Sequence, residues 1–206
     1  AGMNFSYDRY LETVDTFYFN RSDRSLGSFF EYSYDSLENF TLVAGVRLDI
    51  HNRLGTFVTP RLHLRYLPQE STIIRLSIGS GRKAANIFAE NQTLFGTNRR
   101  LNIIDSGGLI YGLNPEKAWN FGLSISQIFN LFGRGANITA DYYITSFTDQ
   151  VVVDWESEGE ISFYNLKGLS RANSFQISFD YNPSEAINLR FAYKNYDVKT
   201  TYNSGF

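Results

Sequence analysis

The chain has 206 residues, of which 43% are apolar and 17% aromatic, and its formal net charge is −2. This composition excludes a disordered chain, which would have few aromatic residues and a high net charge, and it offers no basic field to hold nucleic acid phosphates. Because cysteine is absent, disulfides and thiolate metal sites are also excluded.

The beginning of the chain does not have the pattern of a targeting signal. Residues 1–10, AGMNFSYDRY, contain neither a basic segment nor an apolar one, and no apolar run approaches the roughly 18 residues of a membrane helix. We therefore expect that a signal was removed or that the chain is a piece of a longer protein. Phe206 is interpreted as a truncation point, because the residues before it do not alternate like a membrane strand.

Apolar and polar residues alternate along most of the chain, with the period of two that is typical of β-strands. In 138–146, ITADYYITS, Ile138 and Tyr142 fall on one side of an extended chain, and Thr139 and Asp141 fall on the other. No segment shows a convincing helical period. The pattern predicts an all-β fold with about nine strands, at 3–8, 28–34, 41–51, 58–66, 72–79, 118–127, 138–146, 175–181 and 187–194.

The links between these segments fall into two classes by length. Outer-membrane barrels have short turns at the periplasmic end and longer loops outside the cell. The links of this chain alternate in the same way, which predicts that 80–114 is extracellular. The short links are 36–39, 68–71, 130–135 and 182–185, and the longer ones are 9–26, 80–114 and 149–165, with the tight 51–55 link as an exception.

The charged side chains lie on the side of the strands opposite the apolar residues. That side would line the lumen of a barrel, or face water in a two-sheet sandwich. Charge is absent from the apolar side of most strands, whose lengths approach the roughly 9–11 residues needed to cross a bilayer. We therefore expect a transmembrane antiparallel up-and-down β-barrel. Its lumen-facing residues would be Arg47, Asp49, Arg61, His63, Arg65, Arg75, Asp141, Asp180, Arg190 and Lys194.

Several segments resemble a known family. Residues 79–91, GSGRKAANIFAEN, and 114–123, NPEKAWNFGL, are similar to barrel segments of TonB-dependent outer-membrane receptors, particularly those of the Bacteroidetes type. The resemblance covers nearly the whole chain, because further similar segments occur at 46–51 (VRLDIH), 60–66 (PRLHLRY), 141–147 (DYYITSF) and 163–168 (FYNLKG).

The resemblance implies a barrel of about 22 strands closed by an N-terminal plug. Residues 1–206 would then be a middle-to-late part of that barrel, without the plug, the TonB box and the remaining strands. The implied function is that of a bacterial outer-membrane receptor that captures a nutrient at extracellular loops and imports it by TonB-coupled active transport. The implied partners are outer-membrane lipid and lipopolysaccharide, the TonB complex acting through the missing plug, and a surface lipoprotein. The cargo stays open among a siderophore, haem, cobalamin, a glycan and a peptide.

Residues of the two longest links are the candidates for ligand contacts. In the first link they are Arg82, Asn86, Glu90, Asn91, Arg99 and Arg100. The alternative is that Arg82, Asn86 and Glu90 order the loop by hydrogen bonds, since buried polar groups are normally paired. In the second link, the carboxylates of Asp154, Glu156, Glu158 and Glu160 either attract calcium that bridges lipopolysaccharide or form a solvated acidic loop.

Enzymatic chemistry has no support in the sequence. The histidines, His51 and His63, belong to no recognisable Ser-His-acid arrangement, and no metal-ligand spacing or full phosphate loop is present. We therefore expect no enzyme, no cofactor and no metal site. Two other functions stay open, namely a complete small outer-membrane barrel acting as a passive pore or adhesin, and a soluble β-sandwich that binds carbohydrate through its aromatic residues.

Overall fold

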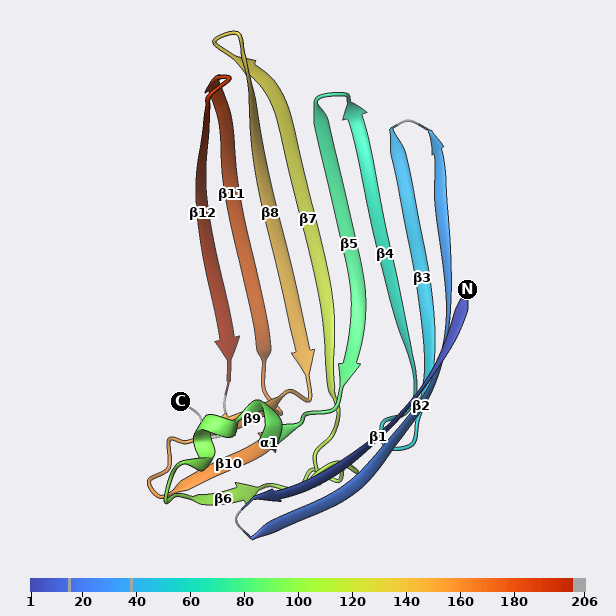
Figure 1. Cartoon of the computed structure of the whole chain (residues 1–206), viewed down its shortest axis with the longest axis vertical. Helices are drawn as coiled ribbons and strands as arrows, with labels where there is room; N and C mark the ends of the chain where they lie inside the picture. The colour runs from blue at the N-terminus through green and yellow to red at the C-terminus, as the bar shows by residue number, and fades with distance from the viewer. Residues whose placement is uncertain (15, 38, 202–206) are drawn as a thin grey trace.

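The computed structural model describes residues 1–14, 16–37 and 39–201, which form one large sheet and a small layer of loops at one end of it (Figure 1). The order of the nine strands in the large sheet is β1 (Gly2–Val14), β2 (Phe17–Leu37), β3 (Phe40–His51), β4 (Gly55–Gln69), β5 (Thr72–Lys83), β7 (Glu116–Leu131), β8 (Arg134–Thr148), β11 (Ser170–Ser184) and β12 (Ile187–Thr200). All neighbouring pairs are antiparallel. The expected all-β fold of about nine strands is confirmed.

The strands of the large sheet are long. They range from 12 residues in β3 to 21 in β2, whereas strands in soluble proteins most often have about 5–6 residues. A tilted strand of about 9–11 residues crosses a bilayer. Each strand of the large sheet is therefore long enough to span one.

Apolar side chains of neighbouring strands meet in rows, because the register preserves their period of two. One row runs through Tyr66, Ile74, Ile125, Ala140, Ile177 and Tyr193. We call this side of the sheet the apolar face, and the other side the polar face. Large residues of the apolar face are exposed, among them Val46 at 45% and Ile125 at 43%. A contiguous exposed apolar surface of this kind indicates contact with another phase or molecule.

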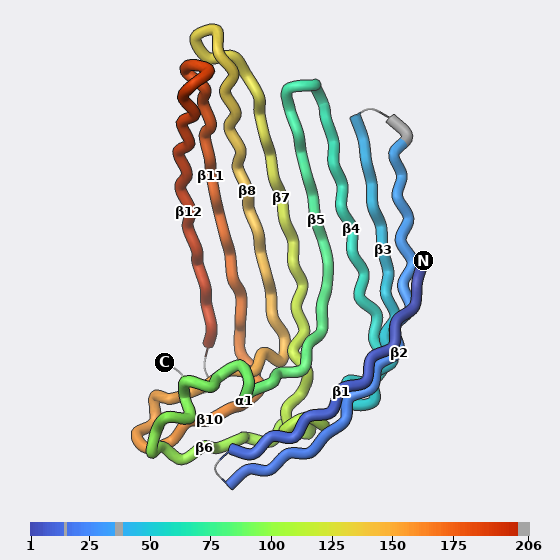
Figure 2. The backbone as a smooth tube through the Cα atoms, viewed as in Figure 1, coloured from blue at the N-terminus to red at the C-terminus, as the bar shows by residue number. Residues whose placement is uncertain are grey.

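The links are sorted by length between the two ends of the sheet (Figure 2). The two-residue turns 70–71, 132–133 and 185–186 occupy one end, which we call the short-turn end. Phe132 and Gly133 have φ values of 50° and 76°, as a type I′ hairpin turn requires at both central positions. The long links 84–115 and 149–169 lie at the other end, together with the tight 52–54 turn.

The two long links fold together into one unit, which we call the loop layer. Its elements are α1 (Ile87–Glu90), the 3-10 helix η1 (Gln92–Phe95), β6 (Arg100–Ile103), β9 (Val151–Asp154) and β10 (Glu160–Asn165). The middle strand, β10, pairs in parallel with β6 and antiparallel with β9. Since β6 comes from the first link and the other strands from the second, this three-stranded sheet joins the two links.

The main hydrophobic core lies in the loop layer. Phe163 and Ile87 are its most buried large side chains, with 0% and 1% of their surface exposed. The ring of Phe88 lies 5.6 Å from that of Phe19 and 5.3 Å from that of Tyr111, measured between centroids. Phe19 belongs to the polar face of β2, by its register with β1 and β3. The loop layer is thus packed against the polar side of the large sheet.

Residues 9–14 and 17–26 are paired strands of a hairpin, so the prediction of a long loop over 9–26 was wrong. β1 and β2 pair from Gly2 and Phe29 to Val14 and Phe17, beyond the position where β3 ends at His51. Polar and charged residues occur on both sides of this extension, including Arg9 and Arg24 on one side and Arg21 and Asp23 on the other. Without alternation, the usual sequence signal of a strand is lost.

The structure contradicts the two alternative architectures. A sandwich requires a second sheet on the apolar face, but the three-stranded sheet belongs to the loop layer on the polar side. A complete small barrel requires pairing between β1 and β12, and over residues 1–14, 16–37 and 39–201 these strands pair only with β2 and β11. Phe206 lies outside the described residues. No helix in the described part of the chain has the length and hydropathy of a membrane span.

Candidate functional site

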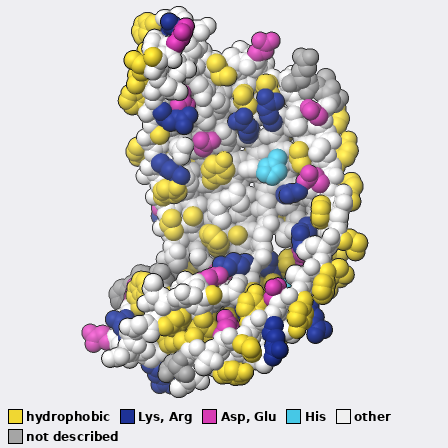
Figure 3. All heavy atoms as spheres, viewed as in Figure 1, with side chains coloured by type: hydrophobic (Ala, Val, Ile, Leu, Met, Phe, Trp, Pro, Cys, Tyr) yellow, Lys and Arg dark blue, Asp and Glu magenta, His cyan; other side chains and the backbone are white. Residues whose placement is uncertain are grey.

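The residues expected to line a lumen all lie on the polar face of the large sheet, as the strand register shows. These residues are Arg47, Asp49, Arg61, His63, Arg65, Arg75, Asp141, Asp180, Arg190 and Lys194. Some of them pair with one another: Arg47 donates to both carboxylate oxygens of Asp49, at 2.7 and 2.6 Å. Arg190 donates to Asp180 at 2.5 Å. Figure 3 shows basic and acidic side chains and a histidine spread over the visible face of the sheet.

A cluster of charged and aromatic side chains fastens the β1–β2 hairpin to the loop layer. The Arg21 side chain is only 5% exposed, and its guanidinium lies 4.2 Å from the ring centroid of Tyr10 and 4.9 Å from that of Tyr111. The Tyr111 hydroxyl donates a 2.5 Å hydrogen bond to Glu12 Oε2. The Arg21 guanidinium, stacked on Tyr10 and Tyr111, holds β1, β2 and the first long link in contact. The hydrogen bond from Tyr111 to the Glu12 carboxylate adds to this contact.

The same cluster extends to the tight turn after β3. Asp23 Oδ1 lies 3.1 Å from Arg53 Nε, and Arg53 Nη1 donates to the carbonyl of Leu109 at 3.1 Å. Burial raises the pKa of Tyr111, and the hydrogen bond to Glu12 raises it further. At neutral pH this hydroxyl therefore keeps its proton and remains a donor.

Four of the six predicted ligand contacts bond to β2, to β5, to α1 or to the tight turn after β3. Arg82 Nη1 donates to the carbonyl of Leu54 at 3.2 Å, and the Asn86 side chain accepts a hydrogen bond from Arg21. Glu90 lies 2.8 Å from Lys83 Nζ, and Asn91 donates to the carbonyl of Ile87 at 2.8 Å. These contacts are those expected of residues that order the loop, which was the alternative for Arg82, Asn86 and Glu90.

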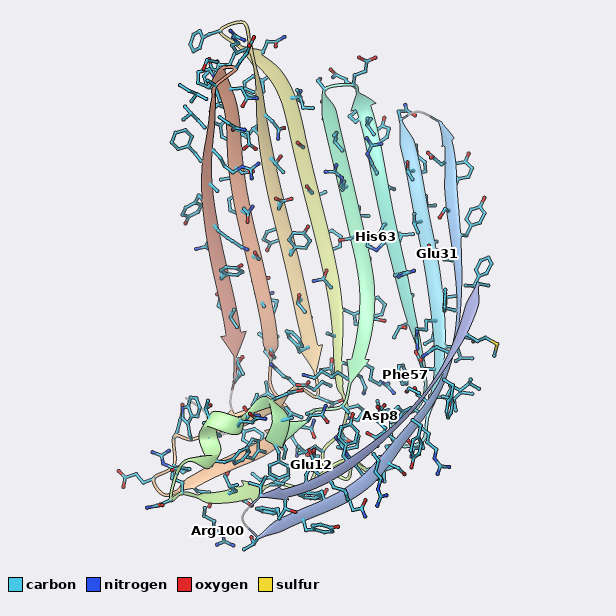
Figure 4. All side chains as sticks on the ribbon, in the orientation of Figure 1. Asp8, Glu12, Glu31, Phe57, His63 and Arg100 are labelled. Atoms are coloured by element: carbon cyan, nitrogen blue, oxygen red, sulfur yellow. The ribbon has the colours of Figure 1, made fainter. Side chains whose placement is uncertain are left out.

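The other predicted contacts, Arg99 and Arg100, lie at an exposed edge of the loop layer. Arg99 Nη1 donates to the carbonyl of Trp155 at 2.8 Å, and the Trp155 side chain is 56% exposed. Arg100 is also exposed, and Figure 4 shows it on the far side of the loop layer from the large sheet. We call Arg99, Arg100 and Trp155 the rim surface.

The acidic residues of the second long link do not converge. Glu160 accepts hydrogen bonds from Asn102 and Ser162, each 2.8 Å long, and the bond from Ser162 lowers its pKa, followed by that from Asn102. Asp154 accepts a bond from the backbone of Glu156 at 3.1 Å, while Glu158 is exposed. Over the described ranges, no group of three or more histidine, cysteine or carboxylate side chains has the arrangement of a metal site.

Two features of the site were missed by sequence reasoning. The Arg21 cluster lies in the hairpin that was interpreted as a loop, and it depends on contacts between residues as far apart as Glu12 and Tyr111. Trp155 stands between Asp154 and Glu156 in the sequence. A tryptophan within an acidic segment was the signal that could have identified Trp155 as part of a binding surface. Such a segment is expected to be exposed, and exposed aromatic residues are typical of binding surfaces.

Comparisons with known proteins found a matching family model and solved structures of similar fold. A family model described as "TonB dependent receptor-like, beta-barrel" matches residues 2–205. A mutant of the ferric enterobactin receptor PfeA from Pseudomonas aeruginosa is 18% identical, with a TM-score of 0.61 over 87% of this chain and 27% of the receptor. The FrpB iron transporter from Neisseria meningitidis is 16% identical, with a TM-score of 0.61 over 90% of this chain and 28% of the transporter.

A third solved structure, the siderophore receptor PirA from Pseudomonas aeruginosa, is 18% identical, with a TM-score of 0.55 over 85% of this chain and 32% of the receptor. At these identities the likeness concerns the fold. This chain thus spans about a quarter to a third of the length of the solved structures that it matches. No curated protein matches the chain.

Proposed function

This chain belongs to the TonB-dependent receptor β-barrel family, and on that premise we propose that it forms part of the wall of a receptor that captures a nutrient and imports it by TonB-coupled active transport. Proteins of this family are found in the bacterial outer membrane and are transporters rather than enzymes. The match over residues 2–205 is the observation that carries the proposal. In this receptor the loop layer faces outward, and the short-turn end faces the periplasm.

The two faces of the large sheet support this orientation. The apolar face carries exposed large side chains such as Val46 and Ile125 and would contact lipid, with lipopolysaccharide in the outer leaflet. The polar face, with residues such as His63 and Asp141, would line the lumen. Further strands and a plug outside these residues would complete the receptor, and TonB would act through that plug. This part of the proposal is supported by the fact that the chain covers only 27% of the PfeA structure that it matches.

The type of receptor and its external partner are further parts of the proposal. The succession of segments from VRLDIH to FYNLKG supports a receptor of the Bacteroidetes type. A surface lipoprotein would then cover the loop layer from outside. The solved structures bear on neither point, since their identities of 16–18% concern the fold.

Ferric siderophores are the first cargo class to test. The solved structures of similar fold include a ferric enterobactin receptor, an iron transporter and a siderophore receptor. The rim surface supplies two exposed arginines, Arg99 and Arg100, and the exposed indole of Trp155. Cationic and aromatic side chains suit an anionic, aromatic iron chelate through ion pairing and cation–π contact.

The test uses the full-length receptor, expressed in a host whose own siderophore receptors are deleted. Cells are given radiolabelled ferric enterobactin, and binding and uptake are measured with and without a proton uncoupler. We expect binding under both conditions and uptake only in energised cells. Arg99→Ala combined with Arg100→Ala should weaken binding by at least about tenfold, which corresponds to about 1.4 kcal/mol. The matched control is Arg134→Ala, which removes an exposed arginine at the short-turn end.

Different results test the transport mechanism, the cargo and the role of the rim surface separately. Uptake that persists in uncoupled cells would indicate a passive pore and contradict the transport mechanism. Failure of ferric enterobactin to bind would reject this cargo, and haem, cobalamin, glycans and peptides would follow in the same assay. Equal weakening by the variants at Arg99, Arg100 and Arg134 would contradict a role for the rim surface.

A further inference from the structure

The large sheet is interrupted between β4 and β5 in the half nearer the loop layer. The pairing of these strands begins near their shared turn and stops at Arg61 and Gly79. Residues 55–60 of β4 and 80–83 of β5 lie beyond that point, and within the described ranges no register pair joins them. Both stretches keep their pairing on the other side, with β3 and β7. Figure 1 shows β4 and β5 drawing apart towards the loop layer, and we call this unpaired stretch the seam.

Pro60 explains where the pairing stops. The backbone N–H of Leu67 donates to the carbonyl of Asn39, which precedes β3, and successive residues of a strand turn their backbone groups to alternate sides. The odd-numbered residues of β4 therefore bond to β3, and the even-numbered ones bond to β5. Pro60 is the first even-numbered residue beyond Arg61, and it has no N–H to donate. The ladder between β4 and β5 thus ends where this proline would have continued it.

A hollow at this end of the seam is lined from both faces of the sheet. Its volume is about 370 Å³, and Pro60 and Ser80 line it from the two strands of the seam. Val46, which also lines it, belongs to the apolar face, whereas Arg61 belongs to the polar face. A hollow on one side of an intact sheet would be lined from that side. The lining therefore indicates an opening through the sheet beside Pro60.

The Arg82 side chain bridges the two strands farther along the seam. By the alternation of β5, Arg82 belongs to the apolar face together with Ile78. Its guanidinium lies 4.8 Å from the ring centroid of Phe57, which belongs to the polar face opposite Asp49. Its Nη1 also donates to the carbonyl of Leu54 at 3.2 Å. Figure 4 shows Phe57 near the end of β4 that adjoins the loop layer. The side chain thus reaches from one face towards the other, which the missing pairing permits.

The backbone along the seam requires a partner. Val58 on β4 and Ser80 on β5 are even-numbered residues that turn their backbone groups towards the seam. An open sheet edge is not tolerated in hydrocarbon, and such backbone occurs at membrane depth only where protein covers it or water reaches it. Because Arg61 and Thr59 line the hollow from the polar side, water from the lumen has a polar path to the seam.

We propose that the seam is a water-filled lateral opening in the barrel wall, through which the lumen meets the outer leaflet of the membrane, and that Arg82 is a clasp that limits its width. The inference rests on the proposed barrel and on the outward orientation of the loop layer, but it does not depend on the cargo. The seam lies in the half of the sheet nearer the loop layer, so it opens at the level of the outer leaflet.

The test compares the access of water to two positions on the apolar face of the full-length receptor in outer membranes. This chain contains no cysteine, so Ser80→Cys and Ser146→Cys each introduce a thiol that is unique in it. Ser80 and Ser146 lie in one row on either side of Trp119, but Ser80 borders the seam and Ser146 lies between two paired strands. A charged methanethiosulfonate reagent should modify the Ser80 variant at least about tenfold faster, equivalent to about 1.4 kcal/mol.

Disulfide formation tests the missing pairing itself. His63 and Ser77 stand opposite each other in the paired half, and Thr59 and Gly81 would do so if the register continued into the seam. We expect cysteines at His63 and Ser77 to form a disulfide under mild oxidation, detected by mass spectrometry of the digested receptor. Cysteines at Thr59 and Gly81 should remain reduced, because a disulfide does not join Cα atoms more than about 7 Å apart. A Cβ atom at Gly81 would meet nothing within 4 Å, so this substitution is accommodated.

The role of Arg82 is tested by adding Arg82→Ala to the Ser80 variant. Modification should become faster still, because the contacts to Phe57 and Leu54 are lost. Lys117→Ala is the matched control: Lys117 stands opposite Arg82 on β7, and its Nζ lies 3.0 Å from Asp149 rather than across the seam. It should leave the rate unchanged. Heat-dependent gel migration shows that each variant forms its barrel, and the two serine variants keep Arg82, so their comparison stays decisive if Arg82→Ala does not assemble.

Four results would contradict the inference. Equally slow modification of the Ser80 and Ser146 variants would show that protein or hydrocarbon fills the seam, and equally fast modification would show that their row lies outside the membrane. A disulfide that forms as readily at Thr59 and Gly81 as in the paired half would show that the strands pair there. Equal rates with Arg82→Ala and Lys117→Ala would reject the clasp.

The inference and the proposed function can fail separately. A receptor that shows heat-dependent gel migration and energy-dependent uptake keeps the proposed function under all four of these results. If the unaltered full-length receptor forms no such barrel in the outer membrane, the proposed function fails first, and the lateral opening fails with it.

Discussion

Gly108 occupies a point where the first long link doubles back on itself. Its backbone N–H donates to the carbonyl of Gly112 at 3.0 Å, and a Cβ atom at Gly108 would overlap the backbone carbonyl of Leu113. Because backbone cannot swing aside as a side chain can, Gly108→Ala should destabilise the loop layer by about 1–3 kcal/mol. The measurement is the rate at which a protease cleaves the link between β5 and β7 in the full-length receptor.

The control is Gly96→Ala in the same link. A Cβ atom at Gly96 would meet nothing within 4 Å, and φ at this position is −80°, which any residue adopts. We expect this variant to be cleaved at the rate of the unaltered receptor. Equal cleavage of the two variants would show that the crowding at Gly108 is relieved without cost.

Tyr111 gives the loop layer a dependence on alkaline pH. Burial raises its pKa in the folded protein above the value of about 10 that it has in an unfolded chain. Its contribution to stability is therefore complete below about pH 10, and is lost as the pH rises from there through the folded pKa. We expect hydrogen exchange in the loop layer to accelerate above about pH 10, beyond the intrinsic pH dependence of exchange.

Tyr111→Phe should abolish this additional dependence, because it removes the group that titrates. It should also cost about 1.5–3 kcal/mol at neutral pH, the usual range for a hydrogen bond to a charged group, since Glu12 loses its donor. Hydrogen exchange measured from about pH 8 to about pH 11 in both proteins checks both expectations, because this window brackets the usual tyrosine pKa. An identical alkaline transition in the phenylalanine variant would assign the transition to another group.

Among the elements, the β1–β2 hairpin depends on a side chain from the turn after β3. The hairpin continues past the end of β3. Beyond that end, the backbone of β2 bonds to the Asn52 side chain instead of to β3 backbone. This side chain accepts a hydrogen bond from the backbone of Arg24 at 2.9 Å and donates one to the carbonyl of Ser22 at 2.9 Å. Asn52→Ala should therefore weaken the hairpin by about 1–3 kcal/mol, because it removes both bonds.

The measurement for Asn52→Ala is hydrogen exchange of residues 9–26 in the full-length receptor. Asn98→Ala is the control, since Asn98 is exposed and makes no side-chain hydrogen bond within the described part of the chain. We expect faster exchange only in the Asn52 variant. Unchanged exchange would mean that pairing with β1 and the Arg21 cluster hold the hairpin without Asn52.

The hairpin also marks the limit of prediction from this sequence. Alternation identified strands wherever one face is apolar and the other polar, as around Ile74 and Arg75. Residues 9–26 lack alternation, so their pairing was not predicted. A hydrogen bond of Asn86 that orders the loop was anticipated, but its partner was not, because that partner is Arg21, which lies in this hairpin. Contacts between residues distant in the sequence leave no local pattern.

At the scale of the whole molecule, the sequence predicted the two faces and the sorting of the links other than 9–26, because both follow from short-range order. The loop layer was not predicted, because its core joins residues from separate links, such as Phe88 and Phe163. The positions of Arg99 and Arg100 follow from the pairing of β6 with β10. That pairing is parallel and joins segments that are distant in the sequence. No turn or repeat in the sequence therefore indicates it.

The two faces of the large sheet should respond in opposite ways to an added charge. Ile177 and Ser178 are neighbours on β11, and the register places Ile177 in the apolar row with Ala140 and Tyr193, and Ser178 on the polar face. If lipid covers the apolar face, Ile177→Lys should cost about 2–4 kcal/mol near the bilayer midplane, whereas Ser178→Lys should cost far less. The measurement is the fraction of full-length receptor that acquires heat-dependent gel migration in the outer membrane. Equal assembly of both variants would mean that water or protein, rather than hydrocarbon, covers the side of the sheet where Ile177 lies.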